Sequence, residues 1–232
     1  MNTIINGLAK AISLILSFDR ELYAIIFLSL KVSGLAVVIA SLIGIPLGAV
    51  CALRRFFGRG VLVTLLNTFM GLPPVVAGLA VYLFLSRSGP LGFMGLLYSP
   101  SAMVIAQAVI AMPIVAALTW SAVASVDARV RETALTLGAT PMMAEWRMLS
   151  EARLSVFSAV IAGFGRTMAE VGAVLMVGGN IAGYTRVMTT TIAMETGKGS
   201  FELAIALGVV LIFVAFVVNV LFRMAQGRGM TV

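Results

Sequence analysis

Two residues of opposite charge lie four positions apart in an apolar stretch of this chain. Arg166 and Glu170 fall near the middle of residues 155–177, where almost every other side chain is apolar or small. Residues four apart on a helix are neighbours, so the spacing predicts an ion pair within one helix. An uninterrupted helix over 155–177 would also place bulky side chains such as Phe164 and Met168 on the opposite face, toward lipid or another helix.

This pair has two interpretations. Charged groups in a membrane helix are costly, and they usually face the interior of a bundle or a wet cavity. Arg166 and Glu170 would either neutralise each other and fix the bundle, or form a gate in which Arg166 meets an anion. The first interpretation is favoured because a paired arginine has little charge to spare.

Other residue types that support catalysis or metal binding are scarce. The chain has no histidine and one cysteine, Cys51, so it lacks the usual proton carrier and the usual ligands of a transition metal. Residues 197–200 read Gly-Lys-Gly-Ser, but a P-loop needs serine or threonine directly after Lys198 and a glycine in place of Ile192. We therefore expect no enzyme, no metal site and no cofactor bound by this chain.

Composition places the chain in a membrane. Hydrophobic residues make up 61% of its 232 residues, charged residues 11%, and the mean hydropathy is +1.10. Soluble domains are about half apolar and about a quarter charged. A net charge of +7 would suggest nucleic acid as the partner of a soluble protein. Here the basic residues lie at the ends of apolar spans, so orientation in lipid explains them better and no nucleic-acid partner is expected.

The predicted fold class is an all-α membrane protein of five or six helices. Residues 1–20 should contain a helix lying on the membrane surface, over 3–17, and residues 21–232 should form the transmembrane domain. Prolines inside the first three spans predict kinks, which suggests a bundle around a water-accessible path. The five predicted spans, each long enough for a hydrocarbon layer of about 30 Å, are 22–53, 61–86, 101–125, 155–177 and 203–224.

The distribution of lysine and arginine predicts the orientation. Nine basic residues fall on one side of the five spans and five on the other, and cytoplasmic segments carry the excess. The N-terminus should therefore lie outside the cell and the C-terminus inside. The nine are Arg54, Arg55, Arg59, Arg129, Arg131, Arg147, Arg153, Arg223 and Arg228, and the five are Lys10, Arg20, Arg87, Arg186 and Lys198.

Two connections lie on the predicted outer side. Residues 87–100 are rich in glycine and proline. Residues 178–202 are long and polar, and the three threonines at 189–191 predict an extended or re-entrant stretch.

A polar, arginine-rich segment at 127–153 lies on the predicted cytoplasmic side. Residues 132–138 should form a short helix that ends at Gly138, and Thr140 can cap a second helix that starts at Pro141. Such a helical hairpin is too polar to insert into lipid and should protrude. Apolar residues edged by charge predict a docking face on it. These residues are Ala134, Leu135, Leu137, Met142, Met143 and Trp146.

The hairpin resembles a known family. Glu132-x-Ala134 with Gly138 six positions after the glutamate is similar to the EAA loop of permease subunits of ABC importers, although Thr133 stands where that family usually has alanine. The resemblance implies a coupling loop at about 127–153 that fits a groove in a separate ATP-binding subunit. The residues it assigns to this contact are Glu132, Ala134, Gly138, Ala139, Met142, Met143 and Trp146.

The next stretch resembles one branch of that family. Residues 163–196 carry Arg166-x3-Glu170-x-Gly172, then Asn180 and the threonine-rich loop, and are similar to permeases for molybdate, sulfate and tungstate, with tungstate permeases most alike. The resemblance implies the transmembrane domain of a type I ABC importer. It implies a homodimer, two copies of an ATP-binding subunit that hold ATP and Mg, and a substrate-binding protein. The residues expected to face that protein are Asn180, Arg186, Thr189 and Thr190.

The predicted function is ATP-driven import of an oxyanion, tungstate first, by alternating access in the cytoplasmic (inner) membrane. Molybdate or sulfate import is the alternative within the same family. An ion-coupled secondary transporter is an alternative outside it. Such transporters often carry an inverted repeat and intramembrane acids, whereas no repeat is evident here and Glu170 has an arginine beside it.

Overall fold

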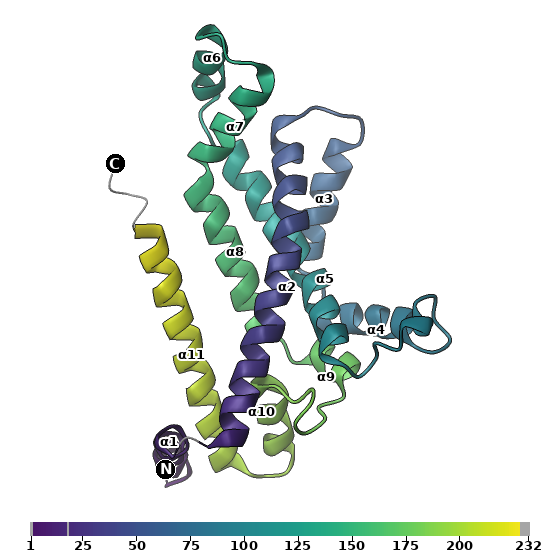
Figure 1. Ribbon diagram of the computed structural model, residues 1–232, viewed down its shortest axis with the longest axis vertical. Helices are drawn as coiled ribbons and strands as arrows, with labels where there is room; N and C mark the ends of the chain where they lie inside the picture. Colours follow the sequence, from purple (N-terminus) through teal and green to yellow (C-terminus); the bar gives the residue numbers. More distant parts are fainter. Residues whose placement is uncertain (1, 18, 228–232) are drawn as a thin grey trace.

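The computed structural model describes residues 2–17 and 19–227, and the regular structure in these residues is entirely helical (Figure 1). The bounds are α1 Asn2–Leu16, α2 Arg20–Leu53, α3 Arg59–Met70, α4 Pro74–Leu85, the 3-10 turn η1 Gly92–Met94, α5 Pro100–Ala124, α6 Ala128–Thr136, α7 Pro141–Glu151, α8 Arg153–Met168, α9 Gly172–Gly178, α10 Met188–Gly197 and α11 Phe201–Gly227.

Three helices run along the long axis of the molecule and confirm the first, third and fifth predicted spans. Helix α2, helix α5 and residues 201–222 of α11 are each long and apolar enough to cross a membrane. Helices α2 and α5 pack closely because α2 has glycine where the two backbones meet. A Cβ atom on Gly48 would lie 2.9 Å from Cβ of Thr119 in α5. Pro46 and Pro113 lie inside α2 and α5, which continue past them.

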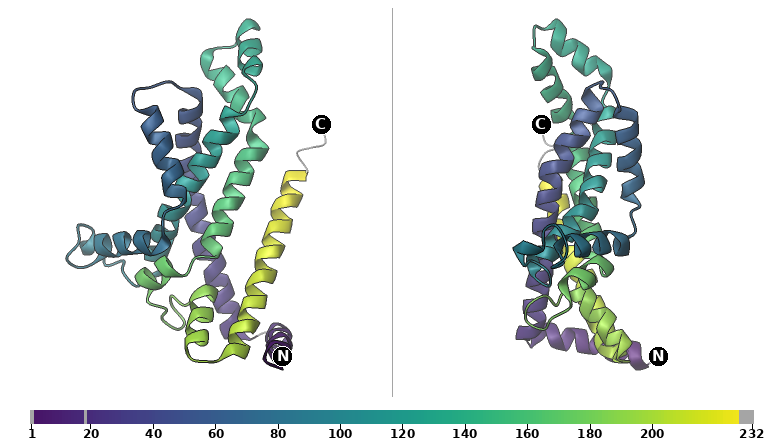
Figure 2. Two further views of the ribbon diagram at one scale, coloured as in Figure 1. Left: turned by 180° about the vertical axis from the view of Figure 1, so that it is seen from behind. Right: turned by 90° about the vertical axis from the view of Figure 1, so that its right-hand side faces the viewer.

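The kink predicted in the second span is present, and it is a sharp bend between two separate helices. Helices α3 and α4 meet at 104°, and α4 lies across the long axis (Figures 1 and 2). The cause is local: Pro73 and Pro74 cannot donate backbone hydrogen bonds, and a residue before proline is pushed away from helical angles. Pro73 itself is extended, with φ −61° and ψ 125°, and Pro74 begins α4.

The prediction of one uninterrupted helix over the fourth span, 155–177, is wrong. Helix α8 ends at Met168 and the short helix α9 begins at Gly172. Helix α9 turns away from α8 and packs against α4 (Figure 1). If α3 with α4 and α7 with α8 are each counted as one bent span, the described residues contain up to five spans, which agrees with the predicted number.

The bulky face of α8 is predicted to meet either lipid or another helix. The structure has the second alternative, because this face is buried against α11, the last span. Phe164 and Met168 belong to a core cluster with Leu207 and Val210 of α11. The ring of Phe164 lies 5.8 Å from that of Phe222 in an edge-to-face arrangement.

The predicted N-terminal helix is present and begins one residue earlier than expected. Helix α1 lies across the base of the bundle beside α11 (Figure 2). The Asn6 amide donates to Glu202 at the start of α11 at 3.0 Å.

The molecule has two distinct ends. Helices α6 and α7 and the α2–α3 connection form the hairpin end, and α1 and α10 form the opposite, α10 end (Figure 1). The basic residues Arg54, Arg55 and Arg59 lie in the α2–α3 connection and at the start of α3, at the hairpin end. Arg228 lies outside the described residues.

Candidate functional site

The hairpin at 127–153 forms as predicted, with its first helix starting at Ala128 instead of residue 132. Asp127 caps α6 by accepting the Arg129 backbone N–H at 2.9 Å, and it pairs with the Arg129 guanidinium at 2.6 Å. This guanidinium holds the pKa of Asp127 below its usual value. Gly138 ends the first helix with φ +85°, in the left-handed region. Thr140 accepts the Met143 N–H at 3.3 Å and caps α7.

The hairpin presents apolar side chains on a polar end of the molecule. Leu137 is 83% exposed and Trp146 66%, and Met142 and Met143 are nearly as open. A hollow of about 700 Å³ lies between α6 and α7. Its lining combines apolar and charged side chains, and consists of Arg129, Val130, Thr133, Ala134, Leu137, Ala139, Arg147 and Glu151. This shape can receive side chains of a protein partner.

The hairpin is firmly joined to the spans. Glu145 of α7 pairs with Arg54 at the end of α2 at 3.3 Å. Helix α7 continues into α8 through Ala152, which is buried with Val123 of α5 and Val156 of α8. These contacts join the hairpin to α2, α5 and α8.

The predicted ion pair is present, but the two residues do not share one helix. Arg166 Nη1 lies 3.5 Å from Glu170 Oε2. Arg166 is in the last turn of α8, while Glu170 lies in the break between α8 and α9. The Glu170 side chain is 2% exposed and that of Arg166 is 34% exposed. The carboxylate is therefore buried, and its partner remains partly open.

Side chains from two other helices hold the break in place. Gln107 Nε2 in α5 donates to the backbone oxygen of Thr167 at 3.0 Å. The Thr189 hydroxyl in α10 donates to the backbone oxygen of Glu170 at 2.8 Å. The Ala173 N–H donates to Glu170 Oε1 at 3.1 Å, so this carboxylate caps α9. The backbone oxygens of Thr167 and Glu170 thus accept hydrogen bonds from side chains of other helices. Such partners allow a helix to stop inside a span.

The sequence interpretation missed Gln107. It is a buried amide in a span that is otherwise mostly apolar, and a polar residue at such a position is the signal that could have identified it.

The two broken helices are packed on each other. A Cβ atom on Gly78 of α4 would lie 2.6 Å from Cα of Ala173 in α9, and one on Gly172 would lie 3.0 Å from Val75 Cγ2. Glycine at these positions lets α4 and α9 touch through their backbones. The Arg166–Glu170 pair therefore lies beside a close contact between α4 and α9.

The residues expected to face a binding protein are only partly exposed. Thr189 and Thr190 are buried in α10, so residues 189–191 are helical and the extended alternative of the prediction is wrong. The Thr190 hydroxyl donates to Asn180 Oδ1 at 2.8 Å. Asn180 has φ +51°, which asparagine tolerates better than most residues. Arg186 pairs with Glu21 at 3.4 Å and is mostly covered. These residues shape the α10 end from within, and Thr189 and Thr190 contribute no open surface to it.

A family model described as a binding-protein-dependent transport system inner membrane component matches residues 44–228. The chain belongs to this family. It is 41% identical over 226 residues to the tungstate uptake system permease protein TupB of Peptoclostridium acidaminophilum, covering 97% of this chain and 99% of that protein. It is 40% identical over 205 residues to a probable anion ABC transporter permease protein of Haloferax volcanii, covering 86% and 88%.

A solved structure has the same fold. The structure of a bacterial ABC transporter involved in the import of the acidic polysaccharide alginate matches with a TM-score of 0.73 and 19% identity, covering 95% of this chain and 83% of that one. The chain is therefore an all-α, multi-pass inner-membrane component with the transmembrane fold of type I ABC importers.

Proposed function

We propose that this chain is the permease subunit of an ATP-driven importer that carries tungstate into the cytoplasm. The observation that carries the proposal is the 41% identity to a tungstate permease over nearly the full length of both chains. Molybdate or sulfate import is the second candidate, since all three substrates are tetrahedral oxyanions and the 163–196 stretch resembles permeases for each.

ATP enters through a partner in this proposal. The sequence has no P-loop, so the chain itself would bind neither ATP nor Mg. Two copies of an ATP-binding subunit would dock on the hairpins of a homodimer. The apolar anchors would be Leu137, which lines the hollow between α6 and α7, and the exposed Trp146 of α7. Together with Trp146, the surface that the resemblance assigns to this contact consists of Glu132, Ala134, Gly138, Ala139, Met142 and Met143.

The proposed orientation places the hairpin end in the cytoplasm. Arg54, Arg55, Arg59, Arg129, Arg131, Arg147 and Arg153 lie in or beside the α2–α3 connection and the hairpin, and cytoplasmic segments carry such an excess of arginine. The α10 end then faces outward and receives the substrate-binding protein, with Asn180 and Arg186 as the nearest candidates among the predicted contacts.

The joints between the hairpin and the spans support an alternating-access mechanism. The Arg54–Glu145 pair and the buried Ala152 joint tie the hairpin to α2 and α8. Closure of the ATP-binding subunits would therefore tilt α8, whose far end carries Arg166 next to the α8–α9 break. Such a mechanism requires two alternative packings of the same helices, and the ATP-binding subunit would shift the equilibrium between them.

Arg166 is the side chain that we propose to meet the anion. About a third of its side-chain surface is open, while its carboxylate partner is covered. An Arg166→Gln variant should lose uptake yet keep binding and stimulating the ATP-binding subunit. Arg166→Lys keeps the charge and should retain part of the uptake. Equal uptake by wild type and Arg166→Gln would assign the pair a structural role only.

Metal uptake in competition tests the substrate. Cells that produce the chain with its ATP-binding and substrate-binding partners would receive tungstate and molybdate together, and intracellular W and Mo would be counted by mass spectrometry. Tungsten should accumulate even with excess molybdate. Preferential uptake of molybdenum would assign the second candidate. Uptake that continues after ATP depletion would reject the ATP-driven importer and favour an ion-coupled transporter.

A further inference from the structure

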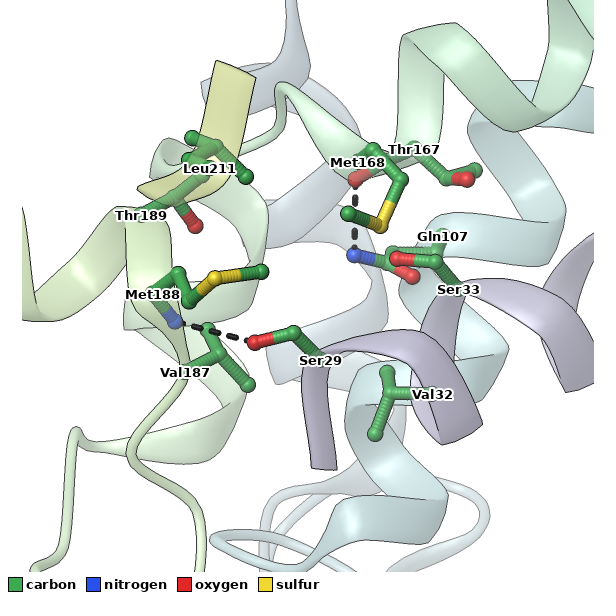
Figure 3. Close-up of a pocket in the computed structure, with 10 residues that line it drawn as sticks. All are labelled: Ser29, Val32, Ser33, Gln107, Thr167, Met168, Val187, Met188, Thr189 and Leu211. Carbon is green, nitrogen blue, oxygen red and sulfur yellow. Dashed lines mark hydrogen bonds between the residues drawn. The ribbon is translucent and has the colours of Figure 1, made fainter. Parts of the chain in front are cut away.

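A small cavity lined mostly by buried residues lies between α2, α5, the end of α8, α10 and α11 (Figure 3). It leaves about 10 Å³ for the centre of a water molecule. Its lining includes hydroxyl and amide groups together with apolar side chains, and none of the lining side chains is charged. The lining residues are Ser29, Val32, Ser33, Gln107, Thr167, Met168, Val187, Met188, Thr189 and Leu211.

One polar atom that faces this cavity has no protein partner. Gln107 is 97% buried, since it is 3% exposed, and its Oε1 atom has no hydrogen bond. The other end of the same amide is fixed, because Nε2 donates to Thr167 O at 3.0 Å (Figure 3). Turning the amide over would place its oxygen against the Thr167 carbonyl, and two acceptors have no proton to share. The free acceptor is therefore a property of the site.

Two of the other polar side chains around the cavity, Ser29 and Thr189, already have partners that limit what they can give. The Ser29 hydroxyl donates to Ile25 O at 2.7 Å and accepts the Met188 N–H at 3.0 Å. The Thr189 hydroxyl donates to Glu170 O. Ser33 lies one helical turn beyond Ser29 and is also buried. A ligand that satisfies Gln107 Oε1 must bring its own proton.

We propose that the cavity holds one ordered water molecule, which donates to Gln107 Oε1 and makes a second hydrogen bond with the Ser33 hydroxyl. A buried water needs room for about one probe sphere and two to four polar partners. The cavity meets both conditions. An ion is disfavoured because no lining residue carries a compensating charge.

The position of this water gives it a structural role. Gln107 fixes the last turn of α8, and Ser33 belongs to α2, so the water joins the α8–α9 break to two spans that the hairpin would move. A water-mediated hydrogen bond is nearly as good as a direct one and can be remade after a shift. The proposed water depends only on Gln107 and Ser33, so the proposal does not depend on which anion is transported.

Radiolytic footprinting tests the proposal in the purified full-length chain. X-rays ionise bound water and create hydroxyl radicals that oxidise the side chains beside it. Met188 lines the cavity and is fully buried. Met103 is equally buried but is absent from the lining, so it is the matched control. Met142 and Met143 are exposed on the hairpin and report radicals from bulk solvent.

The expected result is oxidation of Met188 several-fold above Met103. A bulk radical scavenger should suppress oxidation of Met142 and Met143 but leave that of Met188. Ser33→Val, which removes the hydroxyl and fills the space, should reduce Met188 oxidation to the level of Met103. Met188 and Met103 oxidised equally in wild type would overturn the proposal.

A density map at a resolution that shows water is the second measurement, which does not depend on whether Ser33→Val folds. A peak about 2.8 Å from Gln107 Oε1 supports the proposal. An empty cavity, or a protein donor on Oε1, overturns it.

Discussion

The carboxylate of Glu170 makes two contacts at once, an ion pair with Arg166 at 3.5 Å and a hydrogen bond from the Ala173 N–H at 3.1 Å. It therefore ties the last turn of α8 to the first turn of α9. A carboxylate that is this deeply buried depends on both partners, because an unpaired buried charge loses its hydration without compensation.

The first prediction concerns removal of one partner of this pair. Arg166→Ala should destabilise the chain by roughly 1–3 kcal/mol, the range for leaving a buried polar group without its partner, here the Glu170 carboxylate. Arg166→Ala combined with Glu170→Gln should recover part of the loss, since a glutamine oxygen can still accept the Ala173 N–H. Thermal unfolding of the purified chain in lipid nanodiscs measures both. A double variant that loses the sum of the two single losses would show that the residues are not coupled.

The sequence predicts the hairpin well because its signals are local. Gly138 and Thr140 end one helix and begin the next through their own backbone angles and side chains. The residues that make these contacts lie within three positions of one another. No distant part of the chain is needed to form the turn.

The break at 169–171 could not be predicted in the same way. Two of the groups that satisfy it come from elsewhere: Gln107 is 60 residues away from Thr167, and Thr189 is 19 residues away from Glu170. From residues 155–177 alone, an unbroken helix is the better expectation, because it pairs every backbone group within the segment. The α3–α4 bend differs, since Pro73 and Pro74 signal it in the sequence and the extent of the bend is what was underestimated.

The second prediction tests the docking surface on the hairpin. Trp146→Ala should weaken binding of the ATP-binding subunit by about 30-fold, because loss of a central aromatic anchor costs about 2 kcal/mol or more. Phe216→Ala on α11 is the matched control, since Phe216 is 65% exposed and Trp146 66%. Titration of the labelled permease with the ATP-binding subunit gives the affinities. Equal losses for the two variants would move the docking surface away from Trp146.

The third prediction concerns acid. Arg129 lowers the pKa of Asp127 in the folded chain, so the pair stabilises α6 above the unfolded pKa of about 3.9. This contribution is lost as the pH falls through the lower, folded pKa. Asp127→Asn retains a capping side chain but has no charge to lose. The difference in melting temperature between wild type and this variant should therefore be constant above about pH 5 and shrink below about pH 4.

Melting curves of both proteins between pH 2 and 7 check this expectation, and subtraction cancels the titration of other groups. Arg129→Gln should remove the larger part of this pH dependence, since it takes away the guanidinium, while the backbone N–H of residue 129 still lowers the pKa of Asp127. A difference that does not vary with pH would contradict a lowered pKa of Asp127 in the folded chain.

The fourth prediction separates two glycines of α2. A Cβ atom on Gly48 would lie 2.9 Å from both Thr119 Cβ and Trp120 N of α5, whereas one on Gly34 would meet nothing within 4 Å. Gly48→Ala should therefore force α2 and α5 apart and cost about 1–3 kcal/mol. Gly34→Ala should be neutral or stabilising by up to about 1 kcal/mol, since alanine favours a helix over glycine. Unfolding of the two variants under the same conditions compares them directly. Because the substitution is the same and both sites lie in one helix, a similar loss at both would refute close α2–α5 packing as the reason for glycine at 48.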